Sequence, residues 1–154
     1  MIRGYSFRGS LPKGITMKHL VFVYGTLKNG HLRSSVLQNE RYLGIARTVS
    51  KYAMYQYGGY PALVSSPEEN NHPITGELYE VGDEMMVRLD EIEGTAVGLF
   101  QRGEVALDEV NLTQLPLSEN CWTWINSKKA VAYIFRDADK LKGARNCHSF
   151  WGLK

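Results

Sequence analysis

Five carboxylates crowd one short segment of the chain, and helical spacing divides them between two faces. They are Asp83, Glu84, Asp90, Glu91 and Glu93. Glu93 lies four residues after Leu89 and seven after Met86, so it continues an apolar stripe. Burial on that stripe and the negative end of a helix dipole both raise the pKa of a carboxyl group. Glu93 is therefore a candidate general base. The alternative is a glutamate at the helix end that simply bends out to water.

A second candidate for chemistry is the turn that follows an apolar run. Leu20 to Tyr24 is rich in β-branched and aromatic residues, which predicts a buried strand, and the run stops at Gly25. The backbone N–H groups of such a turn can hold a carboxylate, a phosphate or an oxyanion. The alternative is that Gly25 only makes a turn.

The elements that would position these groups are short strands and one clear amphipathic helix. That helix is predicted over Asp83–Ile92, with Asp83 as its cap, and a shorter one over His31–Gln38. The pattern assigns no element to Asn111–Ser127. Beside the first run, strands are predicted over Arg41–Ser50, Tyr52–Tyr57, Ala62–Val64, Ile74–Val81, Phe100–Leu107 and Lys129–Phe135. About seven strands with one clear helix favour an α+β fold, with an antiparallel or mixed β-barrel and helices at its side.

The composition is that of a soluble globular protein. The 154 residues are 44% hydrophobic and 22% charged, with a formal net charge of +2. The basic residues are scattered, so we expect neither nucleic acid nor a membrane as a partner. Two cysteines without a Cys-x-x-Cys pair fit a reduced, cytoplasmic setting. We expect an N-terminal tail over residues 1–17 and a single domain over residues 18–154.

Two other kinds of site are disfavoured by the spacing. Gly25 to Gly30 has the glycine spacing of a P-loop, but His31 and Leu32 stand where a nucleotide-binding loop needs Lys and then Ser or Thr. The four histidines are scattered without the paired spacing of a zinc or iron site. We therefore expect no metal and no cofactor.

Several blocks of the sequence resemble one known family. Tyr24-Gly25-Thr26-Leu27 resembles the signature of the γ-glutamylcyclotransferase-like family, and Val21–Lys28 is especially similar to its γ-glutamylamine cyclotransferase branch. Further blocks follow in the family's order over Gly59–Val64, Thr75–Val81, Leu89–Gly94 and Phe100–Arg102. The resemblance covers roughly Lys18 to Phe135. It implies a small mixed barrel of about six or seven strands, with flanking helices and a cavity at one mouth.

The resemblance also implies roles for particular residues. Glu93 matches the family's catalytic glutamate, and the N–H groups of Gly25, Thr26 and Leu27 would hold the substrate's carboxylate. Tyr24 would shape this loop or fill the barrel. At the position of Phe100 the family often has a tyrosine that lines the substrate site. Phe100 lacks the hydroxyl group, so its role would be limited to packing.

The implied activity is that of a γ-glutamyl cyclotransferase acting on a small γ-glutamyl substrate without a cofactor. Such an enzyme releases 5-oxoproline and a free amine. One alternative is a non-catalytic module that binds a γ-glutamyl or other carboxylate ligand. Another is a structural or protein-interaction role, which is favoured if the cavity is filled by Trp122, Trp124 or Trp151. The sequence indicates neither the leaving amine nor the oligomeric state.

Overall fold

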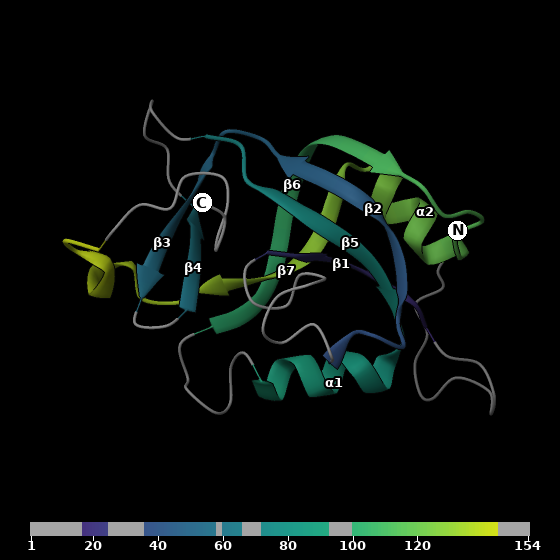
Figure 1. Cartoon of the computed structure of the whole chain (residues 1–154), viewed down its shortest axis with the longest axis horizontal. Helices are drawn as coiled ribbons and strands as arrows, with labels where there is room; N and C mark the ends of the chain where they lie inside the picture. Colours follow the sequence, from purple (N-terminus) through teal and green to yellow (C-terminus); the bar gives the residue numbers. More distant parts are fainter. Residues whose placement is uncertain (1–16, 25–35, 58–59, 66–71, 93–99, 145–154) are drawn as a thin grey trace.

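The protein is built on a closed five-stranded β-barrel (Figure 1). The computed structural model describes residues 17–24, 36–57, 60–65, 72–92 and 100–144. In order around the barrel the strands are β1 (His19–Val23), β5 (Thr75–Val81), β2 (Arg41–Thr48), β6 (Phe100–Leu112) and β7 (Lys129–Phe135). Neighbours pair antiparallel except β1 and β7, which close the barrel in parallel at Val21 and Val131.

The remaining elements lie outside the barrel wall. Strands β3 (Tyr52–Tyr57) and β4 (Tyr60–Ser65) form a separate hairpin, and two helices, α1 (Asp83–Asp90) and α2 (Glu119–Asn126), flank the barrel. A short 3₁₀ helix, η4, covers Ala138–Leu141. The mixed α+β barrel expected from the sequence is confirmed, but the barrel has five strands because β3 and β4 pair with each other.

Alternation along β1 divides the core into an inner and an outer cluster. Leu20, Phe22 and Tyr24 belong to the inner cluster, which fills the barrel. Val21 and Val23 face the other way, into an outer cluster that includes buried residues of α1 and β7. Successive strand residues point to opposite faces, so both sides of β1 are buried and its sequence reads as one continuous apolar run.

Three local expectations need correction. Asp83 is not the cap of α1: Gly82 occupies that position, and the carboxylate of Asp83 instead accepts a hydrogen bond from His19 Nε2 at 2.6 Å. Strand β6 runs on to Leu112, because it pairs with β7 as far as Ala106 and with β2 from Leu107 onward. Helix α2 lies in the segment without an assigned element, where Ser118 accepts a hydrogen bond from the Cys121 N–H.

The charge of Glu80 holds the entry to α2 against the barrel. Glu80 is 8% exposed, and its carboxylate accepts the Ser118 N–H at 2.8 Å and lies 3.4 Å from Arg41 Nη1. Burial raises the pKa of Glu80, but the hydrogen bonds from Ser118 and Arg41 outweigh it and leave the pKa below its usual value. Stability from this carboxylate is thus present above its ordinary pKa and lost as the pH falls through the lowered one.

We expect Glu80→Gln to lower the free energy of unfolding at pH 7 by about 1.5–3 kcal/mol, the range for hydrogen bonds to a charged group. Urea denaturation at pH 7 and at pH 3 measures the effect. The gap between wild type and variant should shrink at the lower pH, because the wild-type carboxylate is losing its charge while the amide does not titrate. An equal gap at both pH values would contradict this account.

Candidate active site

Some of the candidate residues belong to the described part of the structure and others do not. Glu93 and the predicted anchor Gly25, Thr26 and Leu27 lie outside the described residues, as does most of the short helix predicted over His31–Gln38. Tyr24 and Phe100 lie inside them. The residues that flank Glu93 and Gly25 therefore define the candidate site.

Helix α1 presents its faces as the spacing predicts. Met86 and Leu89 are buried, whereas Glu84 and Glu91 are exposed. The α-helix ends at Asp90, and residues 91–92 form a π-turn. The α-helical spacing used to predict the burial of Glu93 therefore ends before that residue.

Asp90, at the end of α1, is held from two strands. Tyr133 on β7 donates its hydroxyl to Asp90 Oδ1 at 2.5 Å. Arg102 on β6 donates from Nη2 to Oδ2 at 2.6 Å and from Nε to Oδ1 at 3.2 Å. Burial and then the Asp90 carboxylate raise the pKa of the Tyr133 phenol, and the same carboxylate raises the pKa of Arg102. Tyr133 therefore stays a neutral donor at physiological pH.

Tyr24 brings the end of β1 to the same place. Its ring is buried, and its hydroxyl donates to the backbone carbonyl oxygen of Tyr133. Tyr24 directly precedes Gly25 in the chain. One residue of β7 thus contacts both the end of β1 and the end of α1.

Phe100 lies at this end of the barrel but on the outer side of its wall. It pairs with Phe135 across β6 and β7, and the two rings meet edge to face with centroids 5.4 Å apart. Phe100 belongs to the outer cluster with Tyr133, whereas Tyr24 belongs to the inner one. The structure brings the two aromatic candidates to one end without placing their rings in the same cluster.

The tryptophans of α2 lie away from this end of β1. Asn120 on the same helix donates to the Lys18 carbonyl oxygen, just before β1 begins, at 2.5 Å. Trp122 is 39% exposed, and Trp124 packs against both clusters. Trp151 lies outside the described residues. The start of α2 thus lies beside the beginning of β1, at the opposite end of that strand from Tyr24.

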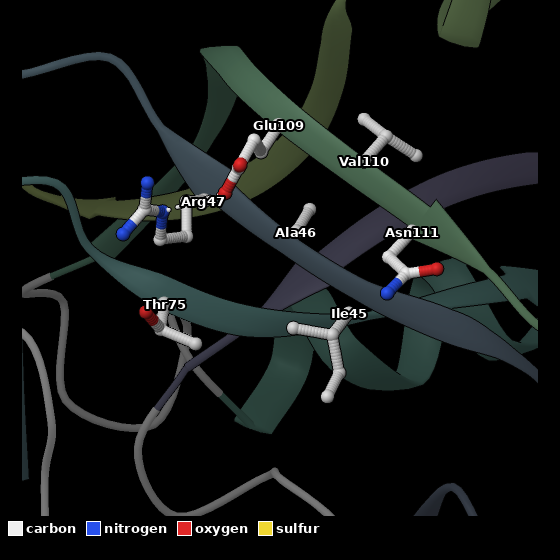
Figure 2. A pocket seen from close by; sticks show the side chains of 7 residues that line it. All are labelled: Ile45, Ala46, Arg47, Thr75, Glu109, Val110 and Asn111. Atoms are coloured by element: carbon white, nitrogen blue, oxygen red, sulfur yellow. Dashed lines mark ion pairs between the residues drawn. The ribbon is translucent and has the colours of Figure 1, made fainter.

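A groove of about 350 Å³ crosses the outer surface of β5, β2 and β6 (Figure 2). Its polar lining includes Thr75, Asn111 and the ion pair between Arg47 Nε and Glu109 Oε1 at 3.0 Å. Its apolar lining includes Ile45. Of the predicted site residues that the structure describes, neither Tyr24 nor Phe100 lines this groove.

Two other kinds of feature are absent from the described part of the chain. No group of three or more His, Cys, Asp and Glu side chains there is arranged to hold a metal ion. None of the helices described has the length and apolar character needed to span a bilayer.

Comparison with known proteins identifies the family. The profile of the family described as "Gamma-glutamyl cyclotransferase, AIG2-like" matches residues 21–147. The chain is 41% identical over 81 residues to a γ-glutamylcyclotransferase candidate from Vibrio cholerae, covering 53% of this chain and 67% of that protein. It is 36% identical over 99 residues to the γ-glutamylaminecyclotransferase of Bos taurus, covering 58% of each.

The fold agrees with this family. The crystal structure of an AIG2-like protein from Mus musculus superposes with a TM-score of 0.59 at 23% identity, covering 79% of this chain and 78% of that one. At that identity the likeness concerns the fold. Together with the family match over most of the chain, it places the protein among known barrels: the chain belongs to the AIG2-like γ-glutamyl cyclotransferase family.

Proposed function

We propose that the protein is a γ-glutamyl cyclotransferase that converts a small γ-glutamyl compound into 5-oxoproline and a free amine. The substrate's own α-amino nitrogen attacks its γ-carbonyl carbon. A new C–N bond closes the five-membered lactam, and the bond from the γ-carbon to the departing amine breaks. Starting from the α-ammonium form, the attacking nitrogen loses two protons and the departing nitrogen gains two, so the amine leaves as an ammonium group.

The observation that carries the proposal is the contact chain from Tyr24 through Tyr133 to Asp90. Gly25 directly follows Tyr24, and Glu93 follows Asp90 by three residues. Because a chain extends by at most about 3.6 Å per residue, the Cα of Glu93 lies within about 11 Å of the Cα of Asp90. The contacts therefore favour placing the predicted base and the predicted anchor near one another.

Each proposed group has a simple task. The α-amino group is basic and mostly protonated at neutral pH, so Glu93 removes a proton from it before the attack and later delivers a proton to the departing amine. The N–H groups of Gly25, Thr26 and Leu27 hold the α-carboxylate. Fixing that end brings the amine to the carbonyl, and orientation of this kind can lower a barrier by roughly 7–11 kcal/mol.

The aromatic candidates have supporting tasks. Tyr24 fixes the start of the anchor loop through its bond to β7. Phe100 contributes an apolar wall by packing against Phe135 and has no hydroxyl to offer a substrate. The mechanism therefore asks for one base, one backbone anchor and a shaped surface.

A panel of γ-glutamyl compounds, scored by the 5-oxoproline and free amine released, tests the function. The panel should contain γ-glutamyl amino acids, γ-glutamyl-ε-lysine and simple γ-glutamyl amines. We expect equal amounts of both products from at least one γ-linked compound. The matching α-glutamyl isomer is the control, because its γ-carboxyl group carries no leaving amine.

The same assay separates an enzyme from a binding module. A binder would raise its melting temperature with 5-oxoproline or a γ-glutamyl compound but release no product from any member of the panel. That pair of results would contradict the proposed function.

A further inference from the structure

We infer that Tyr133 is a positioning residue for the proposed reaction, because it joins the end of α1 to the end of β1. The inference rests on the proposed function. Tyr133 makes the two contacts with different groups: its hydroxyl donates to Asp90, and its backbone carbonyl oxygen accepts from Tyr24. A side-chain substitution at Tyr133 can therefore release one end and leave the other in place.

The bond to Asp90 is built to hold one orientation. The Tyr133 side chain is buried, with 5% of the residue exposed, so little water competes for its hydroxyl. Arg102 lies directly opposite Tyr133 in the pairing of β6 with β7, and it contacts both carboxylate oxygens of Asp90. A carboxylate held at both oxygens cannot rotate without breaking a charged hydrogen bond.

The ion pair with Arg102 alone would hold the Asp90 side chain only weakly. The side chains of Arg102 and Asp90 are 42% and 40% exposed, and ion pairs of this exposure contribute little because water and salt screen them. The hydrogen bond from the buried Tyr133 phenol to Asp90 is less screened by water than the exposed ion pair is. We therefore place the main positional constraint on Tyr133.

The end of α1 needs such a constraint. The helix has eight residues, fewer than an isolated helix needs to be stable in water, so its position depends on tertiary contacts. Met86 and Leu89 bury one side of it. Asp90 is the last residue of the α-helix, and residues 91–92 already form a π-turn. The Tyr133 bond thus fixes the last helical position from which the chain continues toward Glu93.

Loss of the Tyr133 contact and loss of the Tyr24 contact should affect different kinetic constants, the first kcat and the second KM. Tyr133→Phe removes only the hydroxyl, so it loosens the end of α1, from which the proposed base follows. We expect kcat to fall at least about tenfold with KM within about twofold, since an ångström of misplacement can cost about 100-fold. Tyr24→Phe loosens the end of β1, from which the proposed anchor follows, so KM should rise more than kcat falls.

The experiment compares Tyr133→Phe and Tyr24→Phe with Tyr52→Phe as the matched control. Tyr52 is also a buried tyrosine, and its hydroxyl accepts the Ala106 N–H at 2.9 Å, so its loss tests general destabilisation without touching Asp90 or Tyr24. Steady-state kinetics on a turned-over γ-glutamyl compound give kcat and KM. Hydrogen exchange of the peptide covering residues 87–92 should accelerate in Tyr133→Phe and stay unchanged in Tyr52→Phe.

The outcomes distinguish this inference from the function on which it rests. Wild-type protein that turns over nothing in the panel defeats the proposed function and this role with it. An active wild type whose kcat is unchanged in Tyr133→Phe overturns the present inference alone. An equal fall in kcat in Tyr52→Phe also overturns it, because the loss would then reflect general destabilisation.

Discussion

Replacing Glu93 with glutamine should remove 5-oxoproline release while leaving the protein folded. The amide has the size of the carboxylate but cannot take a proton from an ammonium group at neutral pH. General base catalysis contributes typically about 10²–10⁴-fold, so kcat should fall by that factor. Product formed per enzyme over a long incubation measures this range, and the melting temperature checks the fold.

The matched control for this variant is Glu91→Gln. Glu91 is exposed and lies two residues before Glu93, so the change removes the same charge from the same helix end without removing the proposed base. We expect Glu91→Gln to keep more than half of the wild-type kcat. Turnover by Glu93→Gln close to that of Glu91→Gln would exclude Glu93 as the base.

The pH dependence of the variant adds an independent reading. Without a base, only substrate whose α-amino group is already uncharged can react. The residual rate of Glu93→Gln should therefore rise about tenfold per pH unit until the pH approaches the pKa of that amine. Wild-type enzyme should show a flatter profile over the same interval, because its carboxylate removes the proton.

The sequence predicts the strands of this protein better than the way they meet. The apolar runs of β1 and β7 are local signals, and both strands lie where these signals place them. Helix α2 is harder to predict because it is short and rich in Trp, Thr and Ile, which have only middling helix propensity. Its readable signal is Ser118, a favoured N-cap residue that bonds the Cys121 N–H.

The contacts around the candidate site cannot be predicted from one sequence, because they join residues that are far apart in the chain. Asp90 and Tyr133 are 43 residues apart and meet only because α1 packs beside β7. Arg102 joins them because the register of β6 on β7 places it opposite Tyr133. Strand register depends on pairing that local patterns do not specify. The network that joins Asp90, Arg102 and Tyr133 therefore has no local signature in the sequence.

The pairing of β2 with β6 gives the second large effect, at a glycine where the two backbones come close. Gly44 follows a β-bulge on β2, where the register against β5 shifts between Tyr42 and Gly44. Its φ of +150° lies in a region that side chains with a Cβ rarely adopt, and a Cβ built there would stand 2.1 Å from the Asn111 carbonyl oxygen. That oxygen belongs to the backbone of β6, so it cannot rotate away.

Gly44→Ala should therefore destabilise the protein severely. Backbone strain costs about 1–3 kcal/mol, and overpacking costs a further 1–3 kcal/mol, so together we expect a loss of about 2–6 kcal/mol in the free energy of unfolding. Domains of this kind are stable by only about 5–15 kcal/mol. The midpoint of urea denaturation, or failure to purify as a folded monodisperse protein, measures the loss.

Gly103→Ala is the matched control, because it adds the same methyl group to the same strand-rich wall. A Cβ at Gly103 would meet Ile134 Cδ1 at 2.9 Å, which is the far end of a flexible side chain and can turn aside. We expect this variant to stay within about 1 kcal/mol of the wild type, as ordinary substitutions without strain do. A Gly44→Ala protein as stable as Gly103→Ala would show that β2 and β6 can separate at the bulge without loss. The close approach of their backbones would then not be needed for stability.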